Sequence, residues 1–357
     1  MHRIILIIAS ALAAFTAAMA QPRAVFVETR HDFGPILEDN GLAQCEFKVV
    51  NEGTSPLTIL SARASCGCTT PEYSRKPIAP GDTALIGIAF DPAGRPGRFS
   101  KSIVVETNSV PSKTKLEIAG VVVGSEETVG RRYPVDLGPL KLSKSTFALG
   151  DATMGRLKTV YLEGYNRSTD SLRIAVADVP PYLDIAVAPQ TAPPGEQVTL
   201  IAYVMPHKGA DYGVVDDTIT VRVGQDLEYK LPTLLTVHED FSKTDPSKLD
   251  KAPIAVPSTD RIELGMVDKS GAPLTARLRL ENAGKSDLAV RRIYSVDPGV
   301  VASIPTKTIK KGKSAEITVA IDPSLQQGAM LNIRLQIITN DPLQPVHTVR
   351  ILGEWKK

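Results

Sequence analysis

The sequence predicts an all-β protein with three tandem immunoglobulin-like β-sandwich domains after a signal peptide. Three observations predict this fold. The chain starts with a short apolar segment, four landmark residues recur three times at matched spacing, and the apolar residues between them alternate with a period of two. A chain of 357 residues with 27 prolines and 26 glycines also suits two or three domains of short strands and many turns.

The N-terminal segment MHRIILIIASALAAFTAAMAQ has the features of a secretory signal peptide. Arg3 supplies the positive start, Ile4 to Ala18 form the apolar run, and Ala18-Met19-Ala20 is a small-x-small cleavage site. An uncleaved anchor is the alternative, but the run is short and no stop-transfer pattern follows. We therefore expect residues 1–20 to be removed, and the mature chain to be periplasmic or extracellular without a transmembrane segment.

The overall charge is close to neutral. Removing residues 1–20 takes away one Arg and no acidic residue, which leaves a net charge of +1. Because positive and negative residues are interspersed, this balance gives no electrostatic reason to expect nucleic acid or an anionic membrane as a partner.

The strongest signal is an internal repeat. Each unit contains a Gly, an Asn, a second Gly and a Pro, at spacings of 17, 30 and 11 residues in the first and third units and 16, 29 and 11 in the second. The landmarks are Gly34, Asn51, Gly81 and Pro92; Gly150, Asn166, Gly195 and Pro206; and Gly265, Asn282, Gly312 and Pro323. We interpret them as structural turn positions, where Asn and Gly provide positive φ or side-chain capping of the backbone.

Between the landmarks, apolar residues alternate with small or polar ones. The same offsets hold apolar residues in all three units: Ile86, Ile88 and Phe90; Leu200, Ala202 and Val204; and Ile317, Val319 and Ile321. This alternation is typical of half-buried strands whose inner face packs against a second sheet. No helical apolar stripe follows the N-terminal segment, so the sequence favours sandwiches.

The repeat sets the expected domain boundaries. They are a first domain at 24–123, a second at 142–237, a linker at 238–257 and a third domain at 258–357. The stretch VDLGPL before the second domain is either a final strand or an alternative start of that unit. Counting from Gly138 breaks the spacing to Asn166, so we prefer Gly150 as the first landmark of the second unit.

The first unit resembles a known family. Its segments HDFGPI, VVNEGTSPLTI, ASCGCTTPE, PIAPGD, IAFDPAGRPGRFSKSIVVETN and LEIAG are similar to the secreted bacterial family of unknown function numbered 1573. That family is itself similar to the immunoglobulin-like domains of the ASPM, SPD-2 and hydin type and to the major sperm protein sandwich. The resemblance is specific over residues 24–123, and it implies a sandwich fold and an extracytoplasmic setting but no established activity.

The three cysteines are Cys45, Cys66 and Cys68, and all lie in the first unit. Val and Ala occupy the slot of Cys45 in the other two units, which indicates an inward-facing core position. The Cys66-Gly67-Cys68 pair has no counterpart in those units, so the sandwich itself does not require it.

Three interpretations of the cysteines compete. A bridge from Cys45 to Cys66 or Cys68 would close a loop of about twenty residues and contribute about 3 kcal/mol of stability. Alternatively, Cys66 and Cys68 could hold Cu(I), whose two-coordinate chemistry suits sulfur, or they could form a plain turn. We favour the bridge slightly over the plain turn and place metal binding third. Apart from this Cu(I) alternative, we expect no cofactor.

No catalytic constellation is recognisable in the sequence. The four histidines of the mature chain are spread over three units, and nucleophile-elbow, zinc-protease and phosphate-binding motifs are missing. We therefore expect a non-enzyme that binds a protein or a component of the cell envelope, not nucleic acid. The alternative is a copper-binding or redox-related periplasmic protein that acts through Cys66 and Cys68.

Overall fold

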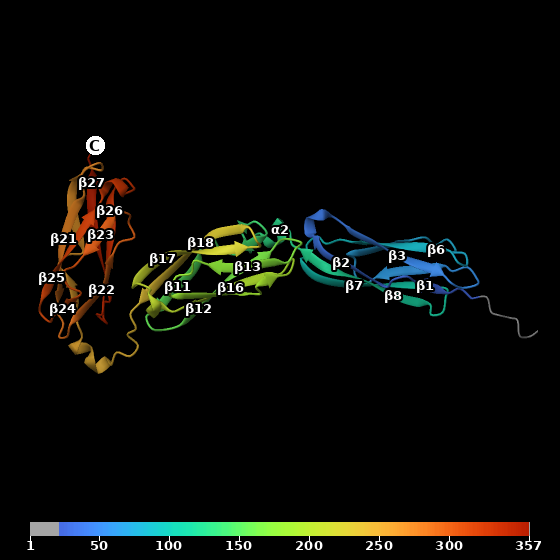
Figure 1. Ribbon diagram of the computed structural model, residues 1–357, viewed down its shortest axis with the longest axis horizontal. Coiled ribbons are helices and arrows are strands. Elements are labelled where there is room, and N and C mark those ends of the chain that lie inside the picture. The colour runs from blue at the N-terminus through green and yellow to red at the C-terminus, as the bar shows by residue number, and fades with distance from the viewer. Residues whose placement is uncertain (1–20, 357) are drawn as a thin grey trace, which may run out of the picture.

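A computed structural model of the chain describes residues 21–356 (Figure 1). The predicted signal peptide, residues 1–20, lies outside the described residues. The described chain forms three tandem immunoglobulin-like β-sandwiches, each made of two sheets. The predicted fold class is therefore confirmed.

The first domain packs two four-stranded sheets face to face. One sheet has the order β1 (Ala24–Phe26), β3 (Ala43–Asn51), β6 (Thr83–Phe90) and β5 (Thr69–Tyr73). The other has the order β2 (Arg30–Leu37), β8 (Lys113–Val123), β7 (Gly97–Thr107) and β4 (Ile59–Ala64). A short 3-10 helix, η2 (Glu38–Asn40), follows β2, and a single helical turn, α2 (Glu126–Val129), follows β8.

The second domain contains two five-stranded sheets. The first has the order β14 (Leu183–Ala188), β16 (Gln197–Val204), β12 (Lys158–Asn166), β10 (Leu140–Leu142) and β9 (Val135–Leu137). The second has the order β11 (Phe147–Thr153), β18 (Leu227–His238), β17 (Gly213–Val223), β13 (Leu172–Ala177) and β15 (Thr191–Ala192). The 3-10 helix η3 (Pro206–Lys208) follows β16.

The third domain follows the 3-10 helix η4 (Pro246–Lys251). Its first sheet has the order β19 (Ala255–Pro257), β21 (Leu274–Asn282), β25 (Ser314–Ile321) and β23 (Val300–Ser303). Its second has the order β20 (Arg261–Val267), β27 (Val346–Trp355), β26 (Met330–Thr339), β22 (Leu288–Tyr294) and β24 (Thr308–Ile309). The 3-10 helix η5 (Pro323–Leu325) follows β25.

Strand pairing moves two of the expected boundaries. The stretch VDLGPL forms the hairpin of β9 and β10, and β10 pairs with β12, so the second sandwich starts before residue 142. Strand β19 pairs with β21 of the third sandwich, although it lies inside the predicted linker 238–257. Neither segment carries a repeat landmark, and for that reason the spacing did not assign them.

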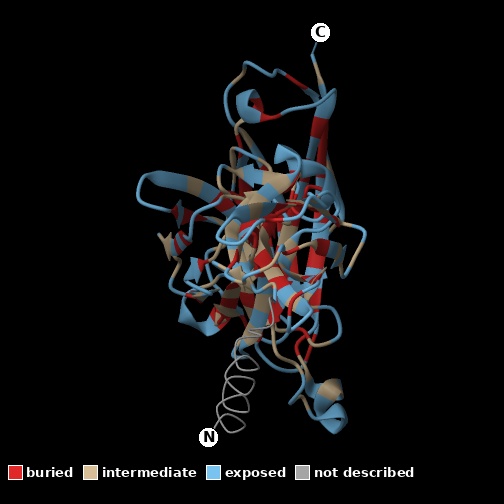
Figure 2. Cartoon of the chain, turned by 90° about the vertical axis from the view of Figure 1, so that its right-hand side faces the viewer, coloured by how far each residue is buried: buried red, intermediate tan, exposed pale blue. Residues whose placement is uncertain are grey.

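The three cores follow the predicted alternation. Along β25, for example, Ala315, Ile317, Val319 and Ile321 are all buried, and the residues between them are not. Each domain has its own large cluster of buried apolar side chains. In Figure 2 the buried residues lie mainly inside the sandwiches, and the exposed ones lie mainly on the outer faces and loops.

The landmark asparagines hold each sandwich together from inside. Asn51, Asn166 and Asn282 are fully buried at strand ends. The amide of Asn282 donates to the carbonyls of Ser286 and Ile309 at 2.8 and 2.9 Å, and its side-chain oxygen accepts from the Gly284 N–H at 3.0 Å. Asn51 and Asn166 make the corresponding bonds in their domains.

The landmark glycines occupy two kinds of position. In each domain the second glycine has positive φ and donates its N–H to the carbonyl of the landmark asparagine, as Gly81 does to Asn51 at 2.8 Å. The first glycines, Gly34, Gly150 and Gly265, are not in turns as predicted. They have φ between 63° and 67° and lie at bulges where the opening strand runs parallel to the last strand of its domain.

The junction between the first two domains is built on a buried carboxylate. Glu38 is 6 % exposed and accepts hydrogen bonds from the Gly94 N–H (2.6 Å), the Ser125 N–H (2.7 Å) and the Thr128 hydroxyl. Burial would raise the pKa of Glu38, but these hydrogen bonds outweigh it and lower the pKa. Beside it, the Gly124 N–H donates to the Tyr165 hydroxyl at 2.8 Å. The first two domains therefore meet along a hydrogen-bonded joint and lie end to end (Figure 1).

The third domain turns across the axis of the other two (Figure 1). Arg291 pairs with Glu239 through two hydrogen bonds of 2.6 and 2.8 Å. Arg292 donates to the Val214 carbonyl at 2.8 Å, and the Val214 N–H donates to the Tyr294 hydroxyl at 2.9 Å. These contacts connect the start of β17 and the end of β18 to β22 of the third domain, and they fix the angle between the second and third domains, which we call the elbow.

Candidate functional sites

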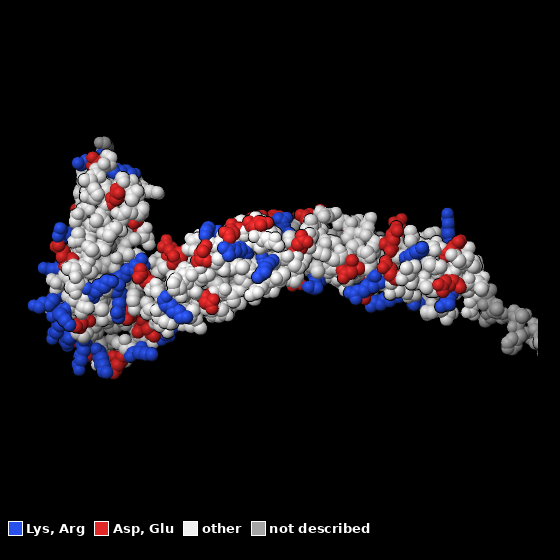
Figure 3. Space-filling view, in the orientation of Figure 1, with Lys and Arg blue, Asp and Glu red and all other residues white. Residues whose placement is uncertain are grey.

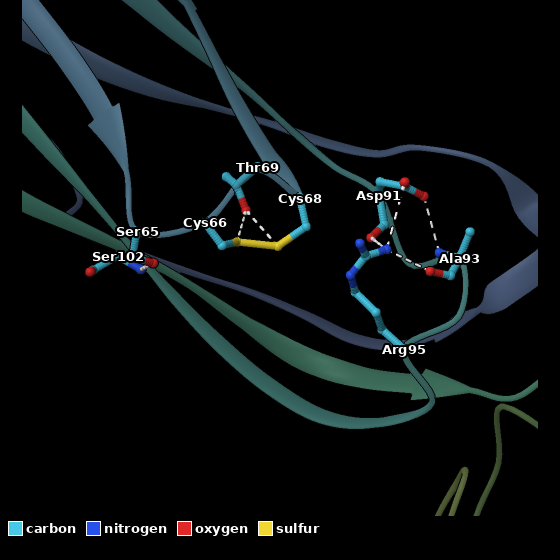
Figure 4. Close-up of a disulfide and its surroundings, with 8 residues drawn as sticks. All are labelled: Ser65, Cys66, Cys68, Thr69, Asp91, Ala93, Arg95 and Ser102. Carbon is cyan, nitrogen blue, oxygen red and sulfur yellow. Dashed lines mark hydrogen bonds and ion pairs between the residues drawn. A yellow bond between two sulfur atoms is a disulfide. The ribbon is translucent and has the colours of Figure 1, made fainter.

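The predicted cysteine site lies where the chain crosses between the two sheets of the first domain. Strand β4 ends at Ala64 and β5 begins at Thr69 in the opposite sheet, and Cys66-Gly67-Cys68 forms the connection. The two cysteines of this connection are joined by a disulfide, with their Cα atoms 5.4 Å apart (Figure 4). We call residues 65–69 the disulfide loop.

Hydrogen bonds on both sides hold the disulfide loop. The Asp91 N–H donates to the Cys68 carbonyl at 2.9 Å, and the Ser65 N–H donates to the Ser102 carbonyl at 2.9 Å. The hydroxyl of buried Thr69 lies 3.7 and 3.9 Å from the sulfurs of Cys66 and Cys68. Both cysteines are partly exposed, so the disulfide can be reached from solvent while its backbone is anchored.

The bridge to Cys45 that the sequence favoured is not formed. Cys45 is free, lies opposite Ile88 on the ladder between β3 and β6, and packs against the core of the first domain. Burial, together with the charges of Glu28 and Glu46, raises the pKa of Cys45 to about 11. Such a thiol stays protonated and unreactive, as expected for the small core residue that the Val and Ala of the other units indicate.

Metal binding requires a different state of the disulfide loop. A disulfide sulfur is a poor metal ligand, so Cu(I) would need Cys66 and Cys68 to be reduced first. Within residues 21–356, no group of three or more His, Cys, Asp or Glu side chains is arranged to hold a metal. A reduced pair would offer two sulfur ligands, which is the number that two-coordinate Cu(I) requires.

A second candidate site lies between the second and third domains. It is a groove of about 390 Å³ whose walls come from β17 and β18 on one side and from β22, β26 and β27 on the other. Its apolar lining includes Val214, Val237, Phe241, Tyr294, Val296 and Ile338. We call this cavity the elbow groove.

Hydrogen bonds hold two polar groups of the elbow groove. Glu239 is held by Arg291, and the Tyr294 hydroxyl is held by the Val214 N–H. At the rim, Arg334 is exposed, and its guanidinium has no carboxylate within 4.0 Å among the described residues. The groove therefore combines a preformed apolar wall with one cation free to pair with a ligand.

Sequence reasoning missed the elbow groove because two domains build it. One signal was present in the pair Ile337-Ile338 on β26, which breaks the alternation. Ile337 faces the core of the third sandwich, whereas Ile338 lines the groove and is 4 % exposed. An apolar residue on the outer face of a strand indicates that something covers that face.

Taken together, the fold and these sites define a tandem immunoglobulin-like sandwich protein with a disulfide loop in its first domain and a groove between its second and third domains. A family model described as "Protein of unknown function (DUF1573)" matches residues 24–122 and 256–354, and the chain belongs to this family. The match confirms the predicted resemblance and extends it to the third domain, which lacks the Cys-Gly-Cys segment.

Solved structures are similar at low identity. A protein of unknown function from Porphyromonas gingivalis is 19 % identical, with a TM-score of 0.47, over 61 % of this chain and 100 % of that chain. An I-band fragment of titin is 12 % identical, with a TM-score of 0.27, over 95 % of this chain and 100 % of that chain. An endo-fucoidan hydrolase from glycoside hydrolase family 107 is 14 % identical, with a TM-score of 0.28, over 88 % of this chain and 42 % of that chain.

At these TM-scores, the similarities carry no conclusion about activity. No curated protein matches the chain. Within residues 21–356, no helix has the length and apolar character needed to cross a bilayer.

Proposed function

We propose that this chain is a non-catalytic, exported protein that binds another protein of the cell envelope or exterior through the elbow groove. The observation that carries the proposal is the groove itself, an apolar cavity of about 390 Å³ at an interdomain elbow. Ligand sites occur preferentially at domain interfaces, and apolar pockets with a few polar groups are typical of them. The immunoglobulin-like fold is compatible with such a role.

Export is supported by the N-terminal segment, which has a charged start, an apolar run and a small-x-small site before Gln21. The non-catalytic part of the proposal is supported by the missing catalytic motifs. Binding would use the apolar wall for affinity and Arg334 for orientation, since an unpaired cation favours a partner with an acidic group beside its apolar one.

The test is a quantitative pull-down from envelope extract with the mature chain and two valine variants. Val296 lies in the groove and is 66 % exposed, and Val110 lies far from it in the first domain and is 81 % exposed. Both side chains are already in contact with water, so Val296→Glu and Val110→Glu should fold equally well. We expect the wild type and Val110→Glu to bind a partner saturably and Val296→Glu to lose roughly tenfold or more, because it places a charge in an apolar pocket.

Two results would contradict this function. One is the absence of any saturable partner for the intact mature chain. The other is a Val296→Glu variant that binds as tightly as the wild type, which would place the contact surface elsewhere on the molecule.

The disulfide loop supports a second candidate function, in thiol exchange or Cu(I) binding. The specific observation is a solvent-accessible disulfide on an anchored loop that the other two domains of the same chain lack. After reduction, Cu(I) binding to the wild type should saturate at about one equivalent, and the Cys66→Ser/Cys68→Ser variant should not bind Cu(I). Cys45→Ser is the matched control and should still take up the metal. This function would be removed if the reduced wild type failed to bind Cu(I) and the oxidised wild type failed to exchange its Cys66–Cys68 disulfide with an added dithiol, which would itself become the disulfide as the pair is reduced.

A further inference from the structure

Lysines gather at one end of the third domain. Three segments that are distant in sequence meet there: η4 with the chain after it, the turn between β21 and β22, and the turn before β25. Backbone hydrogen bonds join them, with the Lys285 N–H donating to Ala252 at 3.0 Å and the Gly312 N–H donating to Asn282 at 3.0 Å. These segments carry six exposed lysines, which we call the lysine tip: Lys248, Lys251, Lys285, Lys310, Lys311 and Lys313.

Three of the six lysines in the lysine tip have no acidic partner among the described residues. Lys248, Lys285 and Lys310 pair with Asp245, Asp250 and Asp287 at 4.0, 3.9 and 2.6 Å. Among the described residues, no carboxylate oxygen lies within 4.0 Å of the amino group of Lys251, Lys311 or Lys313. Figure 3 shows Lys and Arg concentrated over this lower end of the third domain.

The near-neutral total charge conceals this asymmetry. Residues 258–357 hold 15 Lys and Arg against 10 Asp and Glu, a net charge of +5, whereas residues 142–237 hold 8 against 11, a net charge of −3. The three segments of the tip itself, residues 245–252, 281–287 and 310–313, hold six Lys against four Asp and Glu, a net charge of +2. The argument from total charge against an anionic surface therefore does not apply to the end of the third domain. Charge acts locally, because salt screens it beyond about 10 Å.

The form of the lysine tip indicates what kind of anion it would meet. Its lysines stand on three segments at a domain end. Neither the elbow groove nor a second hollow, lined by Asp211, Arg291 and Lys307 among others, includes any of them. A binding site for a single anionic polymer chain or a small anion is typically a groove with Arg side chains, because the planar guanidinium can donate two parallel hydrogen bonds to one anionic group. Lysine is a mobile, hydrated point charge that suits a diffuse layer of phosphates.

We propose that the lysine tip docks the third domain on an anionic phospholipid surface. Each lysine near such a surface strengthens binding by roughly fivefold. The docking is electrostatic, because the six lysines act through their charge and none of them inserts an apolar group. The proposal does not depend on the elbow groove, and it would orient the rest of the elongated molecule relative to the membrane.

The test is co-sedimentation of the full mature chain with vesicles of phosphatidylcholine, with and without phosphatidylglycerol. The tip variant is Lys310→Gln/Lys311→Gln/Lys313→Gln. The matched control, Lys76→Gln/Lys113→Gln/Lys115→Gln, removes three exposed lysines of the first domain and the same total charge. A charge-conserving variant, Lys310→Arg/Lys311→Arg/Lys313→Arg, separates loss of charge from loss of fold.

We expect the wild type, the control and the arginine variant to bind the phosphatidylglycerol vesicles but not the neutral ones. The tip variant should lose roughly 100-fold in affinity, and raising the salt to about 150 mM should weaken all of the binding. Equal losses in the tip and control variants, or no binding of the wild type to anionic vesicles, would overturn the proposal. So would tip-dependent binding of soluble polyphosphate without vesicle binding, because the ligand would then be a polymer.

Discussion

At the residue scale, the cysteines of this chain differ in their bonding, although all three are partly exposed. Cys45 is a free thiol on a strand, and its pKa is raised to about 11 by burial and by Glu28 and Glu46. Cys66 and Cys68 lie on one turn and are joined to each other. Because the disulfide closes a loop of only a few residues, it removes little conformational freedom from the unfolded chain. The structure therefore separates the packing role of Cys45 from the surface chemistry of the pair.

This separation predicts the result of replacing the pair. Cys66→Ser/Cys68→Ser should keep the β-rich fold and lose about 1–2 kcal/mol, instead of the roughly 3 kcal/mol expected from a bridge to Cys45. Chemical denaturation of both proteins measures the difference. Mass spectrometry of the untreated wild type should show Cys66 linked to Cys68 and one thiol, Cys45, that is alkylated more slowly in the folded protein than after unfolding, because its raised pKa keeps it protonated. A peptide linking Cys45 to either partner would contradict the pairing.

A histidine at the same scale predicts a pH dependence. His347 is buried in the third domain, its Nε2 has no hydrogen-bond partner within the described chain, and burial lowers its pKa although nearby Asp341 opposes the shift. The folded protein therefore keeps His347 neutral while the unfolded chain takes up a proton as the pH falls below about 6.5. The contribution of His347 to the free energy of unfolding is therefore complete above that pH. It is lost as the pH falls from there toward the lowered pKa that His347 has in the folded protein.

The measurement is the free energy of unfolding between neutral and mildly acidic pH. His347→Leu should show a flatter pH dependence than the wild type over this window, because the ring that resists protonation is gone. His207 is exposed and provides the control, since His207→Gln should keep the wild-type slope. An unchanged slope in His347→Leu would assign the acid sensitivity to other groups.

At the scale of elements, the same asparagine unit recurs in all three sandwiches. Each asparagine ends a strand, is fully buried, and connects three backbone groups that regular pairing leaves without partners. A buried carbonyl without a donor is costly, so the landmark position is fixed by its hydrogen bonds and not by its turn propensity.

Asn282→Ala should therefore destabilise the third domain by about 3 kcal/mol, since it removes the hydrogen bonds of the buried Ile309 carbonyl, the buried Gly284 N–H and the partly buried Ser286 carbonyl. The matched control is Asn332→Ala on β26, where the side chain is exposed and the loss should stay within about 0.5 kcal/mol. Denaturant unfolding of the full mature chain, followed by a probe of the third domain, gives both values. Equal stability of the two variants would show that water replaces the lost partners.

The elements also show where sequence reasoning ends. Alternation and matched spacing were enough for the three sandwiches, because both follow directly from strand geometry and strand-end hydrogen bonding. They did not assign the β9–β10 hairpin or β19, which belong to sheets through pairing with distant strands. The elbow groove and the lysine tip depend on how domains and turns meet, and no single segment encodes that. Of the candidate sites, the sequence located Cys66 and Cys68, but it did not predict that these two cysteines are bonded to each other.

At the scale of the whole molecule, the two junctions differ in how they are held. Between the first two domains, α2 follows β8 directly and is bound to the buried Glu38 carboxylate. Between the last two, the specific contacts come from β22, and the connecting chain around η4 is mostly exposed. Side-chain contacts therefore hold the walls of the elbow groove in place. The linker around η4 is nevertheless exposed, so proteases can reach it.

Limited proteolysis distinguishes the two junctions. We expect the first cut between Ser242 and Lys251, because this exposed stretch has few packing residues, and the products should be a two-domain N-terminal piece and a third domain starting near Pro253. The stretch around α2 should resist at first, since Glu38 holds it against the first domain. Glu38→Ala removes the acceptor of three hydrogen bonds and should add a second early cut near Ser125, while the cut around η4 stays unchanged. Mass spectrometry of the fragments over time identifies both sites. A first cut inside β3 or β25 would contradict the domain boundaries, and a Glu38→Ala digest identical to the wild type would show that the joint is held by other contacts.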